Sequence, residues 1–127
     1  HTLSHHGQVQ DAIDELSIIE TFHVDQFARF LKKLKEVKEP NGASLLDSTM
    51  SLLGSGMSNA NSHSNRDLPI LLSGGGFKHG GHMHFARGGK QSTPLCNLYL
   101  SMLQNFGMYV DQFNTSSGTL TGLEKIS

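Results

Sequence analysis

The sequence has little of three things: cysteine, charge of one sign, and long apolar runs. Its 127 residues include a single cysteine, Cys96, so no internal disulfide can form, and export is neither implied nor excluded. Ten Lys and Arg against eleven Asp and Glu leave a formal charge of -1, which offers no basic surface to nucleic acid. The longest apolar stretches, 69–72 and 95–103, fall far below the ~20 residues of a membrane-spanning helix. We therefore expect no nucleic-acid partner and no membrane-spanning segment.

Glycine and histidine are the residues in excess. The 127 residues include 14 glycines, above the usual ~7%, and eight histidines. A chain of this length supports one domain, or part of a larger one. Because the sequence opens at His1 without Met or a signal peptide, we expect a fragment or a processed form. The composition itself predicts a loop-rich, histidine-rich site.

Two helices are predicted from apolar spacing and capping signals. In residues 9–37, apolar side chains recur every three or four positions, and acidic residues come early and lysines late, as the helix dipole favours. The second helix is expected to take Thr93 as its N-cap and Pro94 as its first residue, and to stop at Gly107. Cys96 lies in the apolar stretch of this helix, so we expect it to be a small core residue.

Two short apolar segments are predicted to be strands. Residues 49–53 follow a turn around Asp47, and residues 68–72 are continuously apolar, as in a strand buried on both faces. The order helix, strand, loop, strand, loop, helix predicts an α/β fold in which the strands are parallel neighbours packed by both helices. A parallel pair normally needs a crossover of a dozen or more residues, which the connecting loop only just provides. An antiparallel pair is therefore the alternative.

Polar loops follow both predicted strands. Residues 54–67 are rich in Ser and Asn, and residues 73–90 are rich in Gly and His. In parallel α/β sheets, ligands bind beyond the carboxyl ends of the strands. We therefore expect both loops to lie on one edge of the sheet and to form the functional site there.

The first histidines have the spacing of a metal-binding pair. His1 and His5 are four residues apart, which places two imidazoles on one face of a helical turn, where they can hold one metal ion. The third ligand must come from elsewhere, and His63 in the polar loop is the best placed. A chance spacing or the remnant of a cloning tag is the simpler interpretation. His5 or His6 could instead serve as an acid or base.

The second polar loop has the composition of an anion-binding segment. His79, His82 and His84 lie close together in the sequence, with Lys78 before them and Arg87 after them, so the loop is locally cationic. A solvated glycine-rich loop is the alternative interpretation.

Three other features have structural interpretations. The triple glycine of residues 74–76 follows neither of the common nucleotide-binding patterns, so we do not expect nucleotide binding. His23 lies between Phe22 and Val24 in the first helix, which favours a core or boundary histidine over a ligand. Asp67 precedes an apolar strand and is favoured as a turn or ion-pair residue over a catalyst.

The sequence resembles a bacterial family of uncharacterised proteins named after the motif His-x-x-Ser-His-His, which residues 1–6 match. Further matching blocks are residues 21–27, 45–50, 54–57, 67–76 and 93–100. The resemblance covers the whole chain. It implies the C-terminal part of a protein of several hundred residues that is often exported.

A more distant resemblance is to the sulfatase-like and alkaline-phosphatase-like hydrolases. It implies a sandwich with a small sheet flanked by helices, and it matches His1, His5 and His63 to ligands of a divalent metal such as Zn²⁺. It also implies hydrolysis of an anionic phosphate or sulfate ester. Of the acid-base candidates in the motif, we take His6 as the catalytic one. Gly54 and Ser55 depart from the pattern, because they stand where that superfamily carries an Asp-His metal pair. The nucleophile would belong to a missing N-terminal part. The alternative is a non-catalytic exported binding or cell-surface protein with a degenerate hydrolase fold.

Overall fold

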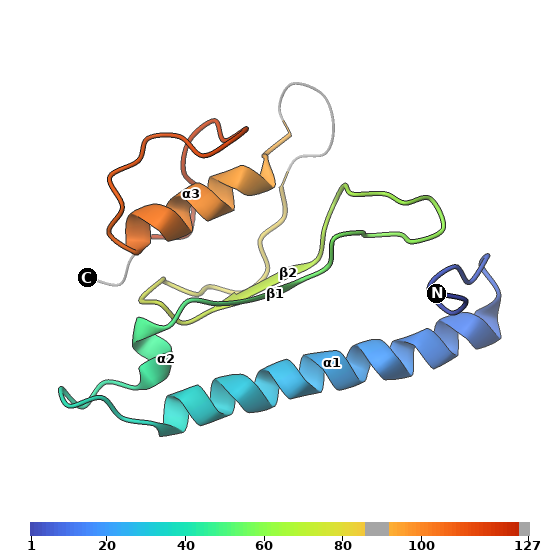
Figure 1. Cartoon of the computed structure of the whole chain (residues 1–127), viewed down its shortest axis with the longest axis horizontal. Coiled ribbons are helices and arrows are strands. Elements are labelled where there is room, and N and C mark those ends of the chain that lie inside the picture. The colour runs from blue at the N-terminus through green and yellow to red at the C-terminus, as the bar shows by residue number, and fades with distance from the viewer. Residues whose placement is uncertain (86–91, 125–127) are drawn as a thin grey trace.

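The chain combines three helices with a two-stranded sheet among the residues that the computed structural model describes, which are 1–85 and 92–124 (Figure 1). The elements are α1 (Gln10–Glu36), α2 (Leu45–Ser48), β1 (Ser51–Gly54), β2 (Ile70–Ser73) and α3 (Leu95–Asn105). This mixed helical and strand structure agrees with the coarse α/β prediction. In the described ranges, no helix has both the length and the apolar character needed to cross a membrane.

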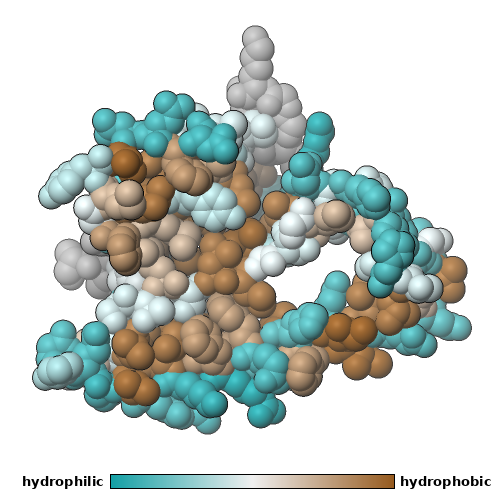
Figure 2. Space-filling model, viewed as in Figure 1, coloured by the Kyte–Doolittle hydropathy of each residue, from teal (hydrophilic) through white to brown (hydrophobic). Residues whose placement is uncertain are grey.

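Helix α1 has almost the predicted extent, but it is not packed as expected. None of its residues is buried, and its apolar side chains include Ile18 at 72% exposure and Phe22 at 59%. Figure 2 shows apolar patches along this helix, between polar side chains. The expectation that α1 packs on the sheet is therefore wrong. The amphipathic spacing produces the helix, but its apolar face is covered only in part. Some apolar residues are exposed, and others are half-buried, namely Ile13, Leu16, Phe27, Leu31 and Leu34.

Helix α3 begins one residue later than predicted. Pro94 has an extended backbone with ψ of 142°, so it is the N-cap, and the first helical residue is Leu95. Asn97 still donates its backbone N–H to the Pro94 carbonyl at 3.0 Å, which closes the first turn. The C-terminal prediction is confirmed: the helix ends at Asn105, and Gly107 follows with a φ of +96°.

The two strands pair antiparallel, so the parallel prediction is wrong and its alternative is confirmed. Ser51 pairs with Ser73, and Gly54 pairs with Ile70. The connection between the strands contains no crossover helix. Instead it forms a turn of its own, closed by an isolated bridge between Asn59 and Ser64. A hairpin needs only a turn, whereas a parallel pair needs a crossover.

This pairing places the two polar loops at opposite ends of the sheet. The loop after β1 forms the hairpin tip, and the loop after β2 leaves from the other end of the ladder (Figure 1). The expectation that both loops share one edge is therefore wrong, because the carboxyl ends of antiparallel strands point in opposite directions.

The triple glycine is a structural turn beside α2. Gly74, Gly75 and Gly76 have φ values of +74°, +68° and +71°, which L-residues rarely adopt. A Cβ atom at Gly74 would overlap the carbonyl oxygens of Leu46 and Thr49. The Gly75 N–H donates to the Leu46 carbonyl at 3.1 Å, so this group is engaged within the fold. These contacts make the triplet a structural turn that packs against the end of α2.

The core is small and lies around α3. Its buried apolar residues are Phe77 at 2% exposure, Leu98 and Leu100. The amide side chain of Asn105, at the end of α3, donates to the Gly75 carbonyl at 2.7 Å. This bond joins α3 to the glycine turn that follows β2.

The C-terminal segment is held against α3 by polar contacts. Ser117 donates its backbone N–H to the Asn97 side chain at 2.9 Å, and Leu120 donates to the Ser101 hydroxyl at 2.8 Å. Both acceptor residues are buried. Cys96 is only half-buried, with the Thr115 hydroxyl 3.3 Å from its sulfur, so the prediction of a core cysteine holds only in part.

Candidate functional site

The histidine motif forms a tight turn before α1. His5 donates its backbone N–H to the His1 carbonyl at 3.0 Å, and the Ser4 hydroxyl donates to the same carbonyl at 2.9 Å. This single helical turn places His1 and His5 one above the other, because residues four apart share a face. Their rings stack with centroids 4.4 Å apart and planes inclined by 27°.

The hairpin tip reaches this turn because helix and hairpin have matching lengths. The 27 residues of α1 rise about 40 Å, and the roughly ten residues from Ser51 to the tip extend about 33 Å. The chain runs along α1, reverses through α2 and returns along β1 (Figure 1). The hairpin tip therefore lies beside the start of α1.

His63 is the tip residue that meets the histidine turn. Its ring contacts the His5 ring edge-on, with centroids 5.1 Å apart and an interplanar angle of 74°. His63 has a φ of +49°, a conformation that a bulky residue adopts only when its surroundings hold it there. The fold thus gathers His1, His5 and His63, the three residues predicted as metal ligands. We call this group the histidine cluster.

The histidine cluster has suitable chemistry for zinc, although its rings are not in a coordinating arrangement. Imidazole nitrogens bind Zn²⁺ at ~2.0–2.1 Å, which sets ligand nitrogens ~3.4 Å apart around a tetrahedral ion. Stacked rings such as those of His1 and His5 do not direct their nitrogens at one point. Within residues 1–85 and 92–124, no group of three or more His, Cys, Asp or Glu is placed to hold a metal ion. Coordination by the cluster requires its rings to rotate.

His6 differs from the other histidines of the motif because one of its ring nitrogens accepts a backbone hydrogen bond. The Gln8 backbone N–H donates to His6 Nδ1 at 3.1 Å, so Nδ1 is an acceptor and carries no proton. The proton of the neutral ring therefore lies on Nε2. With Nδ1 occupied and Nε2 protonated, His6 is suited to donate a hydrogen bond rather than to bind a metal.

Asn61 is the site residue that sequence reasoning missed. Its side-chain oxygen accepts the Gly7 backbone N–H at 3.1 Å. Its side-chain nitrogen lies 3.4 Å from His6 Nδ1 and 3.5 Å from His6 Nε2. The only sequence signal is that Asn61 precedes His63 by two residues in the polar loop, and such loops are rich in Asn for many reasons.

The predicted anion-binding residues lie in another part of the fold. His79 Nε2 lies 3.0 Å from the Gly74 carbonyl, which can only accept, so Nε2 carries a proton. The rings of His82 and His84 stack with centroids 6.5 Å apart. Arg87 lies outside the described residues. Figure 1 shows this segment running from the sheet toward α3, away from the hairpin tip.

Two other residues singled out in the sequence have clear positions. His23 is exposed on α1 beside Phe22, so the prediction of a core or boundary histidine is wrong. Asp67 has a φ of +53°, which agrees with the predicted role in a turn.

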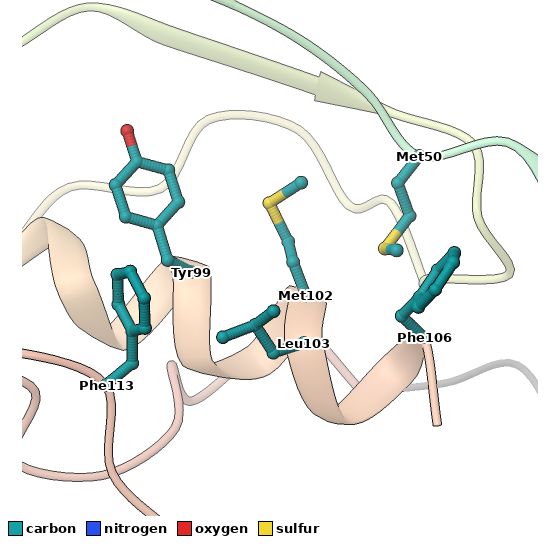
Figure 3. Close-up of a pocket in the computed structure, with 6 residues that line it drawn as sticks. All are labelled: Met50, Tyr99, Met102, Leu103, Phe106 and Phe113. Atoms are coloured by element: carbon teal, nitrogen blue, oxygen red, sulfur yellow. The ribbon is translucent and has the colours of Figure 1, made fainter. Parts of the chain in front are cut away.

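An apolar cleft of about 310 Å³ lies against α3 (Figure 3). Its lining residues are Met50, Tyr99, Met102, Leu103, Phe106 and Phe113. The rings of Tyr99 and Phe113 meet edge-on, with centroids 6.1 Å apart. The lining includes no carboxylate, imidazole or ammonium group, and its polar atoms are the tyrosine hydroxyl and two thioether sulfurs. The histidine cluster therefore remains the better candidate for a chemical site.

Comparison of the chain with known protein families, curated proteins and solved structures finds no significant match.

Proposed function

We propose that this chain carries the metal site of a zinc-dependent phosphate or sulfate ester hydrolase. In this proposal the chain is the C-terminal part of an alkaline-phosphatase-like protein of the His-x-x-Ser-His-His type. The observation that supports it is the grouping of His1, His5 and His63, which come from two segments far apart in the sequence. Three imidazoles with an open fourth position suit a catalytic zinc ion.

Each histidine of this site has a separate role in the proposal. His1, His5 and His63 hold the ion, which would activate water or polarise an ester oxygen when bound. His6 donates its Nε2 proton in a hydrogen bond to the anionic substrate, because its Nδ1 already accepts the Gln8 N–H. His79, His82, His84 and Arg87 are proposed as a separate anion-binding segment.

The proposed partner is an N-terminal part of the same protein, which would supply the nucleophile. Exposed apolar side chains on α1 support this partner, because Phe22 and Ile18 lose contact with water when another segment packs on them. The two-stranded sheet supports it as well, since so small a sheet is marginal alone.

A second candidate function is binding without catalysis, in an exported or cell-surface protein with a degenerate hydrolase fold. The turn after β1 favours it, because Gly54 and Ser55 offer no ligand for a second metal. The Ser55 hydroxyl instead donates to the Met57 carbonyl at 2.7 Å. A single weak metal site would serve for recognition of an anion.

Calorimetric titration with zinc tests the proposed site. We expect the wild-type protein to bind about one equivalent and His5→Ala to lose that binding, because His5 contacts both other members of the cluster. His23→Ala is the matched control, since it removes an exposed imidazole far from the motif in sequence. Equal zinc binding by wild type and His5→Ala would contradict the proposal.

Ester hydrolysis by the zinc-loaded protein together with its N-terminal part separates the two functions. Turnover of a phosphate or sulfate ester that falls in His6→Ala supports the hydrolase. Zinc and anion binding without turnover favours the second candidate.

A further inference from the structure

We propose that Asn61 is a positioning residue, which couples the hairpin tip to the histidine turn. It fixes the His6 ring and holds His63 beside His5. The part of this inference that concerns zinc rests on the proposed zinc site, whereas the coupling itself does not require a metal.

The contacts of Asn61 span the two segments that form the site. Its side-chain oxygen accepts the Gly7 N–H at 3.1 Å, directly after the histidine motif. Its side-chain nitrogen lies 3.4 Å from His6 Nδ1, the atom that also accepts the Gln8 N–H. Oxygen and nitrogen of one amide thus contact adjacent residues of the turn. Asn is suited to this position because one short side chain offers both an acceptor and donors.

Unusual backbone angles on both sides of this contact indicate that the two segments are held in place by their surroundings. Gln8 has a φ of +66°, and His63 has a φ of +49°. Residues other than glycine keep this sparsely populated conformation only where surrounding contacts determine it. Asn61 lies between the two strained segments and bonds to the residue next to Gln8.

The turn around Asn61 is itself closed by hydrogen bonds. The Asn59 side chain accepts the Ser62 N–H at 3.2 Å, and Ser64 donates its N–H to the Asn59 carbonyl at 3.0 Å. Asn61 therefore presents its amide from a fixed turn, and the position of that amide sets the position of His63 two residues later.

The remaining histidine contact depends on this placement. His63 meets His5 edge-on with ring centroids 5.1 Å apart, and both rings are reachable from solvent. Besides this ring contact, the tip meets the turn through Asn61, which accepts the Gly7 N–H and places its amide nitrogen 3.4 Å from His6 Nδ1 and 3.5 Å from His6 Nε2. Loss of its amide frees the tip to move relative to the turn.

The test uses the whole 127-residue chain and three variants. Asn61→Ala removes both halves of the amide contact, whereas Asn61→Asp keeps an acceptor for the Gly7 N–H and removes the donor that faces His6. Asn65→Ala is the matched control, because Asn65 is an exposed asparagine of the same loop. The first readout is metal-free: exchange of the Gly7 amide proton, and the ring ¹⁵N shifts of His6 that report its tautomer.

We expect Gly7 exchange to become roughly five-fold faster in Asn61→Ala, the change that corresponds to losing one typical hydrogen bond. Asn61→Asp keeps the slow Gly7 exchange and changes the His6 ring shifts. Asn65→Ala changes neither. If Asn61 only maintained the shape of the loop, Asn61→Asp and Asn61→Ala would change Gly7 exchange and the His6 ring shifts alike.

The second readout is zinc affinity. We expect the Kd for zinc to rise roughly ten-fold or more in Asn61→Ala, as for other residues that orient a metal ligand without touching the metal. Unchanged Gly7 exchange and His6 shifts in Asn61→Ala would overturn the coupling. A wild-type chain that binds no zinc, with the metal-free effects intact, would overturn the proposed function alone.

Discussion

The His5 ring meets the His63 ring edge-on with centroids 5.1 Å apart, so the first turn of the chain touches the tip of its hairpin. If both rings hold the same ion, their contributions to zinc affinity are not independent. We expect His63→Ala to weaken zinc binding more than ~100-fold, beyond the loss seen for residues that only orient a ligand.

The double variant tests the same relationship. His5→Ala combined with His63→Ala should bind zinc no more weakly than either single variant, because one lost ligand already disables the site. Calorimetry on the three variants checks it. Additive losses would show that the two histidines act at separate sites.

Substitution of Gly74 should destabilise the fold. Alanine there meets two backbone carbonyls and must adopt a φ of +74°. We expect Gly74→Ala to lower the free energy of unfolding by about 1–3 kcal/mol, which is the cost of a residue held in such a backbone conformation. Gly56→Ala is the control, since nothing lies within 4 Å of the added Cβ atom. Urea denaturation of both variants compares them, and equal midpoints would refute the structural role of the glycine turn.

The ionisation of Asp47 should make the free energy of unfolding depend on pH in the acidic range. Hydrogen bonds from the Ser44 side chain and the Ser44 backbone N–H lower the pKa of Asp47 from its ordinary value of 3.8. A carboxyl whose pKa is lower in the folded state stabilises the fold above the ordinary value. That stability is lost as pH falls from there through the lowered pKa.

The Asp47→Asn variant checks this effect. It should be less stable than wild type near pH 7 and should approach wild-type stability as the pH falls through the lowered pKa of Asp47. Asp25→Asn, which removes an exposed carboxylate of α1, serves as the comparison. Thermal unfolding across this pH range measures the difference, and a constant gap at every pH would contradict the capping role.

Two phenylalanines should differ sharply in their effect on stability. Phe77 is 2% exposed and Phe22 is 59% exposed. We expect Phe77→Ala to cost about 3–5 kcal/mol, as in other buried sites, and Phe22→Ala to change stability by about 0.5 kcal/mol or less. Chemical denaturation of the two variants provides the comparison. A large loss in Phe22→Ala would show that the face of α1 is covered.

Local signals in the sequence predicted the helices and the turns. The spacing in α1 and the glycine at the end of α3 are properties of neighbouring residues, and the structure agrees with them to within one residue at the start of α3. The expected polar turn around Asp47 is the short helix α2, with Ser44 and Asp47 as its capping box. Such features need no knowledge of the rest of the chain.

Long-range relationships were not predictable in the same way. The direction of β2 depends on whether residues 55–69 turn back or cross over, and apolar alternation carries no information on that choice. The role of Asn61 depends on the similar lengths of α1 and the hairpin, which bring its side chain to Gly7. The attachment of the tail through Asn97 and Ser101 depends on polar contacts in a weakly patterned segment.

A ligand that binds both the histidine turn and the hairpin tip would link the two ends of the first half of the molecule. Helices α1 and α2 and strand β1 all lie between His5 and His63 in the chain. A ligand that binds the folded form and not the unfolded chain stabilises the folded form, and this stabilisation grows as the ligand concentration rises. Helix α1 buries none of its own residues, so it would be secured by its two ends rather than along its sides.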